Sequence, residues 1–323
     1  MMAAGATRLA AMLALMLCAA TALAQTYPTR PIRIVVPYAA GSTTDLQGRM
    51  IADVLAESMG QPVIVENRAG ASGTIGSERV SRAEPDGYTL VLGSAASHLV
   101  SAVLMATPPY DPTRDFAPVS LVTKYPNVVV VNPSMGVKTM GELIQAMRDK
   151  PGTPYGTAGP TTAGRLTAEL LQSRLGLKMT MVPYNGSAPA MTDLVAGHLP
   201  LAIVDIAPVA PLLNTGKVIP LAVTSTVRSP IAPQIPTLAE TGIKDFESVA
   251  WLGLFAPPDT PLWIREKLSA EIRNGLNRPE LRNKIEQSGA ILVASTPQEL
   301  HDYLSTELAQ WRIRVRENNI KAD

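Results

Sequence analysis

The stretch PIRIVVPYAAGSTTD (residues 31–45) contains a strand, a tight loop and the start of a helix. Apolar residues alternate and then run together over residues 32–36, a pattern typical of a buried strand. Small residues follow Pro37, and an amphipathic helix pattern begins near Thr44. The first turn of a helix leaves backbone N–H groups without intrahelical partners, and the helix dipole adds positive potential there. The stretch therefore predicts an anion-binding loop.

The rest of the chain repeats this alternation of strand and helix, which is typical of a parallel α/β sheet covered by helices. A first α/β unit precedes residue 94, and a second of similar size spans residues 127–224. One more strand and two helices close the chain. The predicted strands are 32–36, 63–66, 88–93, 127–131, 153–157, 180–183, 201–205, 219–224 and 249–255, and the predicted helices are 44–58, 77–83, 140–149, 162–175, 188–196, 261–276 and 297–318.

Length and composition exclude several classes of protein. A chain of 323 residues exceeds the usual size of one core, so we expect two domains. Hydrophobic residues make up 46% and charged residues 17%, which is ordinary for a globular protein. A net charge of +1 without blocks of like charge gives no electrostatic footprint for nucleic acid or an anionic membrane. Anion binding must therefore arise from local geometry.

The first 24 residues have the pattern of a secretory signal peptide, with Arg8, an apolar run over residues 9–20 and a cleavage site at 22–24. The run is shorter than the roughly 20 residues that span a bilayer. We therefore expect cleavage and export to the periplasm rather than a membrane anchor. Cys18, the only cysteine, lies in this segment, so the mature chain is predicted to have no disulfide.

Two loops open helices and are candidates for binding. Ser42 and Asp45 have the spacing of a capping box, in which Ser42 caps the helix and Asp45 reaches back to it. The small residues before Ser42 let a ligand approach the backbone. A similar loop at residues 155–162 opens the helix that carries Arg165. Together the two loops could hold both ends of a dicarboxylate. Arg165 either pairs with a ligand carboxylate or is a solvated side chain in the first turn.

Other motifs are less specific. Gly70, Gly73 and Gly76 are a poor match to a dinucleotide fingerprint, so we interpret them as a turn that needs positive φ. Asp205 ends a predicted strand, where open α/β sheets bind ligands. It either orients a donor group on a ligand or caps the following turn.

Signals of catalysis are absent from the sequence. The histidines are His98, His198 and His301, and none has a metal-ligand spacing. There is no G-x-S-x-G motif and no P-loop. We expect His98 to line a cleft and the other two to lie on the surface. We predict a receptor without catalytic residues, metal or cofactor; the alternative is an exported enzyme acting on a carboxylate, with Asp205 or His98 as its base.

Many of the 28 prolines lie in expected connections. Rigid connections suit two lobes that move as bodies, although simple turn punctuation fits as well. The prolines in question are Pro108, Pro109, Pro112, Pro118, Pro126, Pro230, Pro233 and Pro236.

Six segments occur in order along the mature chain: YPTRPIRIVVPYAAGSTTD, GQPVIVENRAGASGTIG, PDGYTL, PYDPTRDFAPVSLV, VPYNGSAPAMTDLVAG and GKVIPLAVTS. Together they resemble the Bug family of periplasmic solute-binding proteins, the TctC-like receptors of tripartite tricarboxylate transporters. The resemblance implies a two-lobed α/β periplasmic-binding-protein (Venus-flytrap) architecture with a ligand cleft between the lobes. We expect lobe 1 to comprise residues 25–124 and 250–323, lobe 2 residues 125–249, and the hinge to lie near 123–125 and 248–251.

The resemblance also implies which residues hold the ligand. In this family, the loops matching residues 38–45 and 157–162 bind a carboxylate through backbone groups, small hydroxyls and ordered waters. The predicted ligand-binding residues are Tyr38, Ala39, Ala40, Gly41, Ser42, Thr43, Asp45, Ser94, Thr157, Ala158, Gly159, Thr161, Thr162, Arg165 and Asp205.

The chain departs from the family pattern at three positions. Ser42 replaces the second glycine of the first loop, Thr161 replaces a glycine of the second, and Arg165 stands where histidine is common. We hypothesise that Arg165 favours a second acidic group on the ligand. The resemblance implies small carboxylates as ligands and, as partner, a membrane permease of one large and one small subunit. We expect a monomer. A ligand-presenting subunit of a sensory system remains an alternative.

Overall fold

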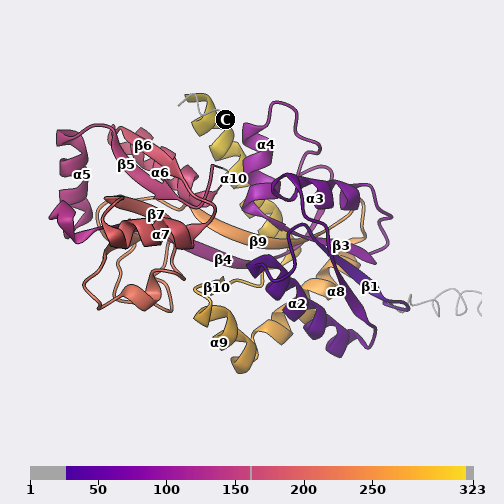
Figure 1. Ribbon diagram of the computed structural model, residues 1–323. Coiled ribbons are helices and arrows are strands. Elements are labelled where there is room, and N and C mark those ends of the chain that lie inside the picture. The colour runs from indigo at the N-terminus through magenta and orange to yellow at the C-terminus, as the bar shows by residue number, and fades with distance from the viewer. Residues whose placement is uncertain (1–26, 161, 318–323) are drawn as a thin grey trace, which may run out of the picture.

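The computed structural model describes residues 27–160 and 162–317. The predicted signal peptide and Cys18 lie outside the described residues. Within the described chain, ten strands form one continuous sheet in the order β2-β1-β3-β9-β4-β7-β5-β6, with β8 and β10 also paired to β4. Figure 1 shows two bodies side by side, joined by the long strands β4 (Ala117–Val131) and β9 (Val249–Ala256).

One half of the sheet is built on the opening stretch of the sequence. β1 (Ile32–Val36) pairs in parallel with β2 (Val63–Asn67) and β3 (Thr89–Ser94). β3 continues antiparallel to β9, which pairs with the first part of β4. The short β10 (Ile291–Leu292) adds to β4.

The other half of the sheet uses the second part of β4. Residues 127–131 pair antiparallel with β7 (Leu201–Asp205) and 128–131 with β8 (Ile219–Val223). β5 (Thr153–Thr157) runs parallel to β7 and to β6 (Met179–Pro183). β4 therefore contributes to both halves, and its pairing changes between Pro126 and Asn127.

Helices cover both faces. β1 shows why, because Ile32, Ile34 and Val36 pack into one apolar cluster with α2 and α8, while Val35 belongs to another. The helices are α2 (Thr43–Met59), α3 (Thr74–Ser81), α4 (Ser101–Leu104), α5 (Met140–Asp149), α6 (Ala163–Leu175), α7 (Ser187–Ala196), α8 (Leu262–Leu276), α9 (Pro279–Gln287) and α10 (Pro297–Glu317), with a π-helix at Ala96–Val100 and short 3-10 turns at Ala71–Gly73, Pro133–Met135 and Ala210–Leu212.

The predicted strands and helices are confirmed to within three residues at each end, apart from the start of β4. That strand was predicted to begin at residue 127, yet it begins ten residues earlier. Pro118 and Pro126, expected in connections, lie inside it. Proline cannot donate to a ladder, and the pairing of β4 with β9 shifts register just after Pro118.

Two closing helices were predicted, and the structure has three, because α9 and the adjacent β10 gave no recognised pattern. Within residues 27–160 and 162–317, no helix has the length and apolar character needed to cross a membrane.

Candidate ligand-binding site

A cavity of about 690 Å³ lies where the two halves of the sheet meet, lined by residues of both. The first turns of three helices line it, namely those of α2, α6 and α7. The ends of β3, β5 and β7 and the face of α9 complete its walls. Its polar side chains come from Tyr38, Thr43, Thr44, Gln47, Ser94, Tyr125, Asn127, Thr157, Thr162, Ser187, Asp205, Lys284 and Ser288.

The first predicted loop contributes to the cavity where it joins α2, at Thr43 and Thr44. Ser42 caps α2, since its Oγ accepts the N–H of Asp45 at 3.2 Å. The carboxylate of Asp45 reaches back one residue further than predicted and accepts the N–H of Gly41 at 2.8 Å. Gly41 has φ +81°, which favours glycine. The amides of Gly41 and Ser42 are used inside the loop. Those of Thr43 and Thr44 have no partner within the described part of the chain and can donate to a ligand.

Asp45 fixes the loop and is not among the described residues that line the cavity. Its side chain is buried and also accepts from Arg49 at 3.0 Å and from Asn67 at 2.8 Å. Burial alone would raise the pKa of Asp45, but the Gly41 amide, Arg49 and Asn67 together hold that pKa below its usual range. Asn67 also donates to the Tyr38 carbonyl oxygen. Of the predicted first-loop residues, Tyr38 and Thr43 line the cavity, whereas Ala39, Ala40, Gly41, Ser42 and Asp45 do not.

Tyr38 and Ser94 meet at the end of β3, where the tyrosine hydroxyl lies 2.5 Å from Ser94 Oγ. Gly70 and Gly73 have φ of +145° and +91°, as their interpretation as a turn requires, whereas the prediction is wrong for Gly76, which lies inside α3 without a positive φ. A Cβ on Gly73 would lie 2.9 Å from the Tyr38 hydroxyl, so this glycine makes room for Tyr38.

The second loop is closed by threonine hydroxyls. Thr162 caps α6, donates to the carbonyl of Gly159 at 2.8 Å and lies 3.0 Å from the hydroxyl of Thr157. Thr157, Ala158 and Thr162 line the cavity, while Gly159 does not, and the predicted residue Thr161 lies outside the described residues.

Arg165 is not among the described residues that line the cavity. Its side chain is 6% exposed, so the solvated alternative is wrong. Nη1 donates to the carbonyl oxygen of Pro160 at 3.0 Å, which holds the second loop from behind.

Asp205 lines the cavity at the end of β7, opposite Asn127 of β4. Within the described residues its carboxyl accepts from Ser187 Oγ at 2.9 Å, at the start of α7, rather than capping the turn that follows. Burial raises the pKa of Asp205 and outweighs the opposing effect of the Ser187 hydrogen bond.

Several cavity residues were missed from the sequence. Leu46, Gln47 and Met50 continue the face of α2 that starts at Thr43, and helical periodicity counted from the loop would have found them. Lys284, Ile285 and Ser288 come from α9 and its end, a segment for which no element was predicted.

The prediction that His98 lines the cleft is wrong. His98 is fully buried and stacks on Phe255 with 4.3 Å between ring centroids. Its Nδ1 lies 2.9 Å from Ser97 Oγ, and burial lowers the pKa of His98 to about 3. His198 and His301 are exposed, as predicted.

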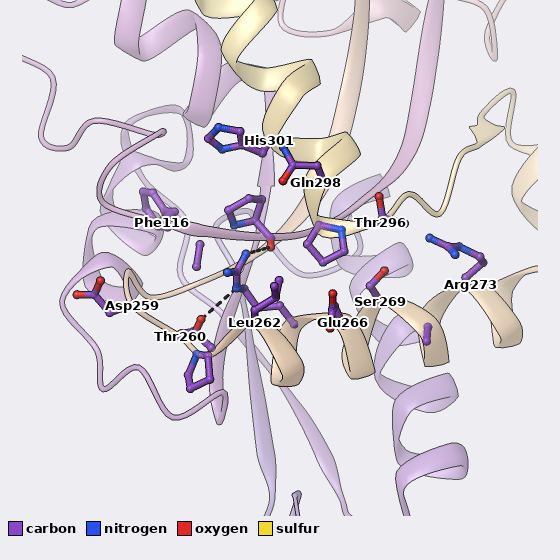
Figure 2. Close-up of a pocket in the computed structure, with 16 residues that line it drawn as sticks. Phe116, Asp259, Thr260, Leu262, Glu266, Ser269, Arg273, Thr296, Gln298 and His301 are labelled. Carbon is purple, nitrogen blue, oxygen red and sulfur yellow. Dashed lines mark hydrogen bonds between the residues drawn. The ribbon is translucent and has the colours of Figure 1, made fainter.

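A second groove, of about 930 Å³, lies between α8 and the start of α10 and contains none of the predicted loop residues. Figure 2 shows side chains that line this groove, among them Thr260 and Arg273. Arg265 also lines it and donates to the carbonyl oxygens of Thr260 at 3.0 Å and Pro118 at 3.3 Å. Arg273, the other arginine among the described residues of the groove, donates to the carbonyl oxygen of Ala294 at 3.0 Å. Both arginines therefore serve the backbone, and the cavity with three helix N-termini is the better candidate site.

Comparison with known proteins identifies the chain at the level of family. The family model described as "TctC: Tripartite tricarboxylate transporter family receptor" matches residues 48–320. The chain belongs to the TctC receptor family. The predicted resemblance is thereby confirmed, and because this is a family of transport receptors, the enzyme alternative is not supported.

Relatives of this TctC receptor are similar over nearly their whole length. Protein BugT of Bordetella pertussis is 35% identical over 305 residues, covering 94% of each chain. A Rhodopseudomonas palustris protein solved with adipate is 34% identical with a TM-score of 0.76, covering 91% of this chain and 99% of that one. MatC of the same organism, solved with bound malate, is 31% identical with a TM-score of 0.73, covering 90% and 100%. The TctC receptor thus has the mixed α/β periplasmic-binding-protein fold.

Proposed function

We propose that this TctC receptor captures a small organic carboxylate in its cavity and delivers it to a tripartite tricarboxylate-type membrane transporter. The observation that carries the proposal is the convergence of the first turns of α2, α6 and α7 on one cavity. Free amides and the positive ends of three helix dipoles favour an anion there. The relatives solved with adipate and malate support a carboxylate as that anion.

The energetics require only a few contacts. A hydrogen bond to a charged group contributes about 1.5–3 kcal/mol, and micromolar affinity needs about 8 kcal/mol. The first-turn backbone amides of Thr43 and Thr44 in α2, Gly164 in α6 and Ala188 in α7 supply that number of donors.

We further propose that residues 25–124 with 250–323 and residues 125–249 are two lobes that close on the ligand. β4 and β9 run from one proposed lobe to the other, and polar contacts lie at the point where they pass between the lobes. Thr224 accepts from the Asn127 amide at 3.0 Å and donates to the Ser248 carbonyl at 2.7 Å. These contacts lie beside the expected hinge, and closure around it would shield the ligand.

The proposal includes export, with a cleaved leader over residues 1–24 and a monomeric receptor in the periplasm. Its partner would be a permease of one large and one small subunit. The leader pattern and the family's role in transport support this placement.

The test is a thermal-shift and calorimetric screen of the mature protein against mono-, di- and tricarboxylates, with the neutral amides of the same acids as controls. A true ligand at about 100 times its Kd stabilises the native state by roughly 2.7 kcal/mol. At least one acid should stabilise the protein with one-to-one stoichiometry, and its amide should not. Stabilisation by the amide alone, or by none of the acids, would overturn the proposal.

A further inference from the structure

We propose that Lys284 on α9 binds a second acidic group of the ligand, so that the receptor prefers linear aliphatic dicarboxylates to their monoesters. This inference rests on the proposed carboxylate-binding function. It moves the second acidic group from Arg165, where the sequence suggested it, to another wall of the cavity.

The charges around the cavity support this assignment. Among the described residues that line the cavity, Asp205 and Lys284 are the only ones of the types Asp, Glu, Lys and Arg. Asp205 already accepts from Ser187, and burial favours its neutral acid. Lys284 is thus the cation of the lining.

Lys284 differs from its neighbours on the same helix. Arg282 pairs with Glu286 at 3.1 Å, and Arg278, just before α9, pairs with Glu57 at 2.9 Å. Lys284 is exposed, and no carboxylate within residues 27–160 and 162–317 forms an ion pair with it. Its ammonium group is therefore available to a ligand acid.

The position of Lys284 places it away from the first loop. Ser288 lies one helical turn after Lys284 and near the Tyr125 hydroxyl, which accepts from Gln47. Gln47 lies one turn of α2 beyond Thr43, where the first carboxylate is proposed to bind. The path from the loop to Lys284 thus spans one turn of each helix, with Tyr125 between them. A ligand that reaches both ends needs a spacer between two acidic groups.

Apolar side chains line the cavity beside this path. Leu46 and Met50 lie one turn apart on α2, and Ile285 follows Lys284 on α9. Leu46 is 60% exposed although it lines the cavity. An aliphatic spacer would cover this side chain and remove apolar surface from water, which favours methylene groups over hydroxyl-rich spacers.

The experiment measures, by calorimetry on the mature protein, the affinities for glutarate, adipate and pimelate and for the monomethyl ester of each. The ester removes one charge and keeps the chain. The wild type should prefer at least one diacid, and Lys284→Met should lower the ratio of diacid to monoester affinity about fivefold, the strong end for an exposed ion pair. Lys284→Arg should keep the preference, which should also weaken as salt screens the pair.

Lys217→Met is the matched control, because Lys217 is exposed and does not line the cavity, so the ratio should not change. A wild type that binds diacids and monoesters equally, or a Lys284→Met variant with an unchanged ratio, would overturn this inference while leaving the carboxylate receptor intact. A wild type that binds none of these acids, and none in the wider screen, would instead overturn the proposed function and this inference with it.

Discussion

At the scale of single residues, two aspartates of one site are held in opposite ways. Asp45 accepts from the Gly41 amide, Arg49 and Asn67, and its pKa is lowered despite burial. Asp205 accepts from Ser187, and burial raises its pKa. Asp45 therefore stabilises the fold in its ionised form, whereas the folded state favours the protonated form of Asp205.

Replacing Asp205 by Asn should stabilise the protein at high pH. Because the folded-state pKa is raised, stability is lost as the pH rises from the unfolded value of about 3.9 through the folded pKa. Asp205→Asn should therefore melt a few degrees above the wild type at pH 8, since 1 kcal/mol shifts Tm by roughly 2–4 °C. The difference should vanish near pH 4. Melting curves across this pH range check it, and a difference that does not change with pH would contradict it.

Replacing Asp45 by Asn should have the opposite pH dependence. A lowered folded-state pKa means that the stabilisation is present above the unfolded pKa and is lost as the pH falls through the folded pKa. Asp45→Asn should cost about 1.5–3 kcal/mol at pH 7, converge with the wild type in acid, and weaken ligand binding by loosening the loop. Asp53→Asn, an exposed aspartate on the same helix, is the control for denaturant unfolding. Equal losses in the two variants would refute the role of Asp45.

At the scale of elements, the first turn of α6 packs closely on the sheet. A Cβ on Gly164 would lie 2.4 Å from the Ile203 carbonyl oxygen of β7 and 2.6 Å from Thr157 Oγ1. Backbone cannot give way as a flexible side chain can. Gly164 therefore sets how deeply the start of α6, and with it the second loop, sits in the site.

Gly164→Ala should destabilise the protein by about 1–3 kcal/mol through overpacking and should weaken carboxylate binding as α6 shifts. Gly141 occupies the same second position in α5, and a Cβ there would meet nothing closer than 4.0 Å. Gly141→Ala should be neutral or slightly stabilising, because alanine favours a helix by about 0.5–1 kcal/mol. Denaturant unfolding and titration of both variants check the prediction, which fails if they behave alike.

The elements also show what the sequence could predict. Loop-to-helix signals placed α2 and α6 and the loops before them correctly, because caps and periodicity are local. The predicted strand was shorter than β4 because Pro118 and Pro126 hide the strand pattern. Pro118 lies beside a register shift, and Pro126 lies where the pairing of β4 changes from β9 to β7. α9 was missed because Ile285 is its one fully buried side chain among the described residues, so it has no apolar stripe to recognise. The cavity wall from α9, including Lys284, was missed with it.

At the scale of the whole molecule, β4 and β9 connect the two halves and place the cavity between them (Figure 1). Hydrogen bonds between residues far apart in the sequence position the site, such as the one from Thr123 Oγ1 to Gln47 Oε1 at 2.8 Å. A single sequence read without an alignment contains no signal for such contacts. Local patterns therefore predicted where the two loops lie, while only the fold could show which of their residues line the cavity.

Saturating carboxylate should close the lobes and lower the radius of gyration measured by small-angle X-ray scattering. Closure is expected because a ligand held by first turns from both halves binds the closed form better than the open one. The dimethyl ester of the same acid should leave the radius unchanged. One-to-one binding of the acid without any compaction would show that the cavity works as a rigid pocket.

Because α9 contributes little to the core, changes in this helix could alter which ligands a receptor binds without unfolding it. This helix is a nine-residue segment that fully buries Ile285 and otherwise presents partly or fully exposed residues. The loops before α2 and α6 lie far from α9 in the sequence, and the hydrogen bonds that hold them do not involve α9. An exchange of α9 between related receptors would thus replace the cavity wall that carries Lys284 and leave the two loops unchanged. New ligand preferences could then arise while the proposed binding of the first carboxylate by the loops is kept.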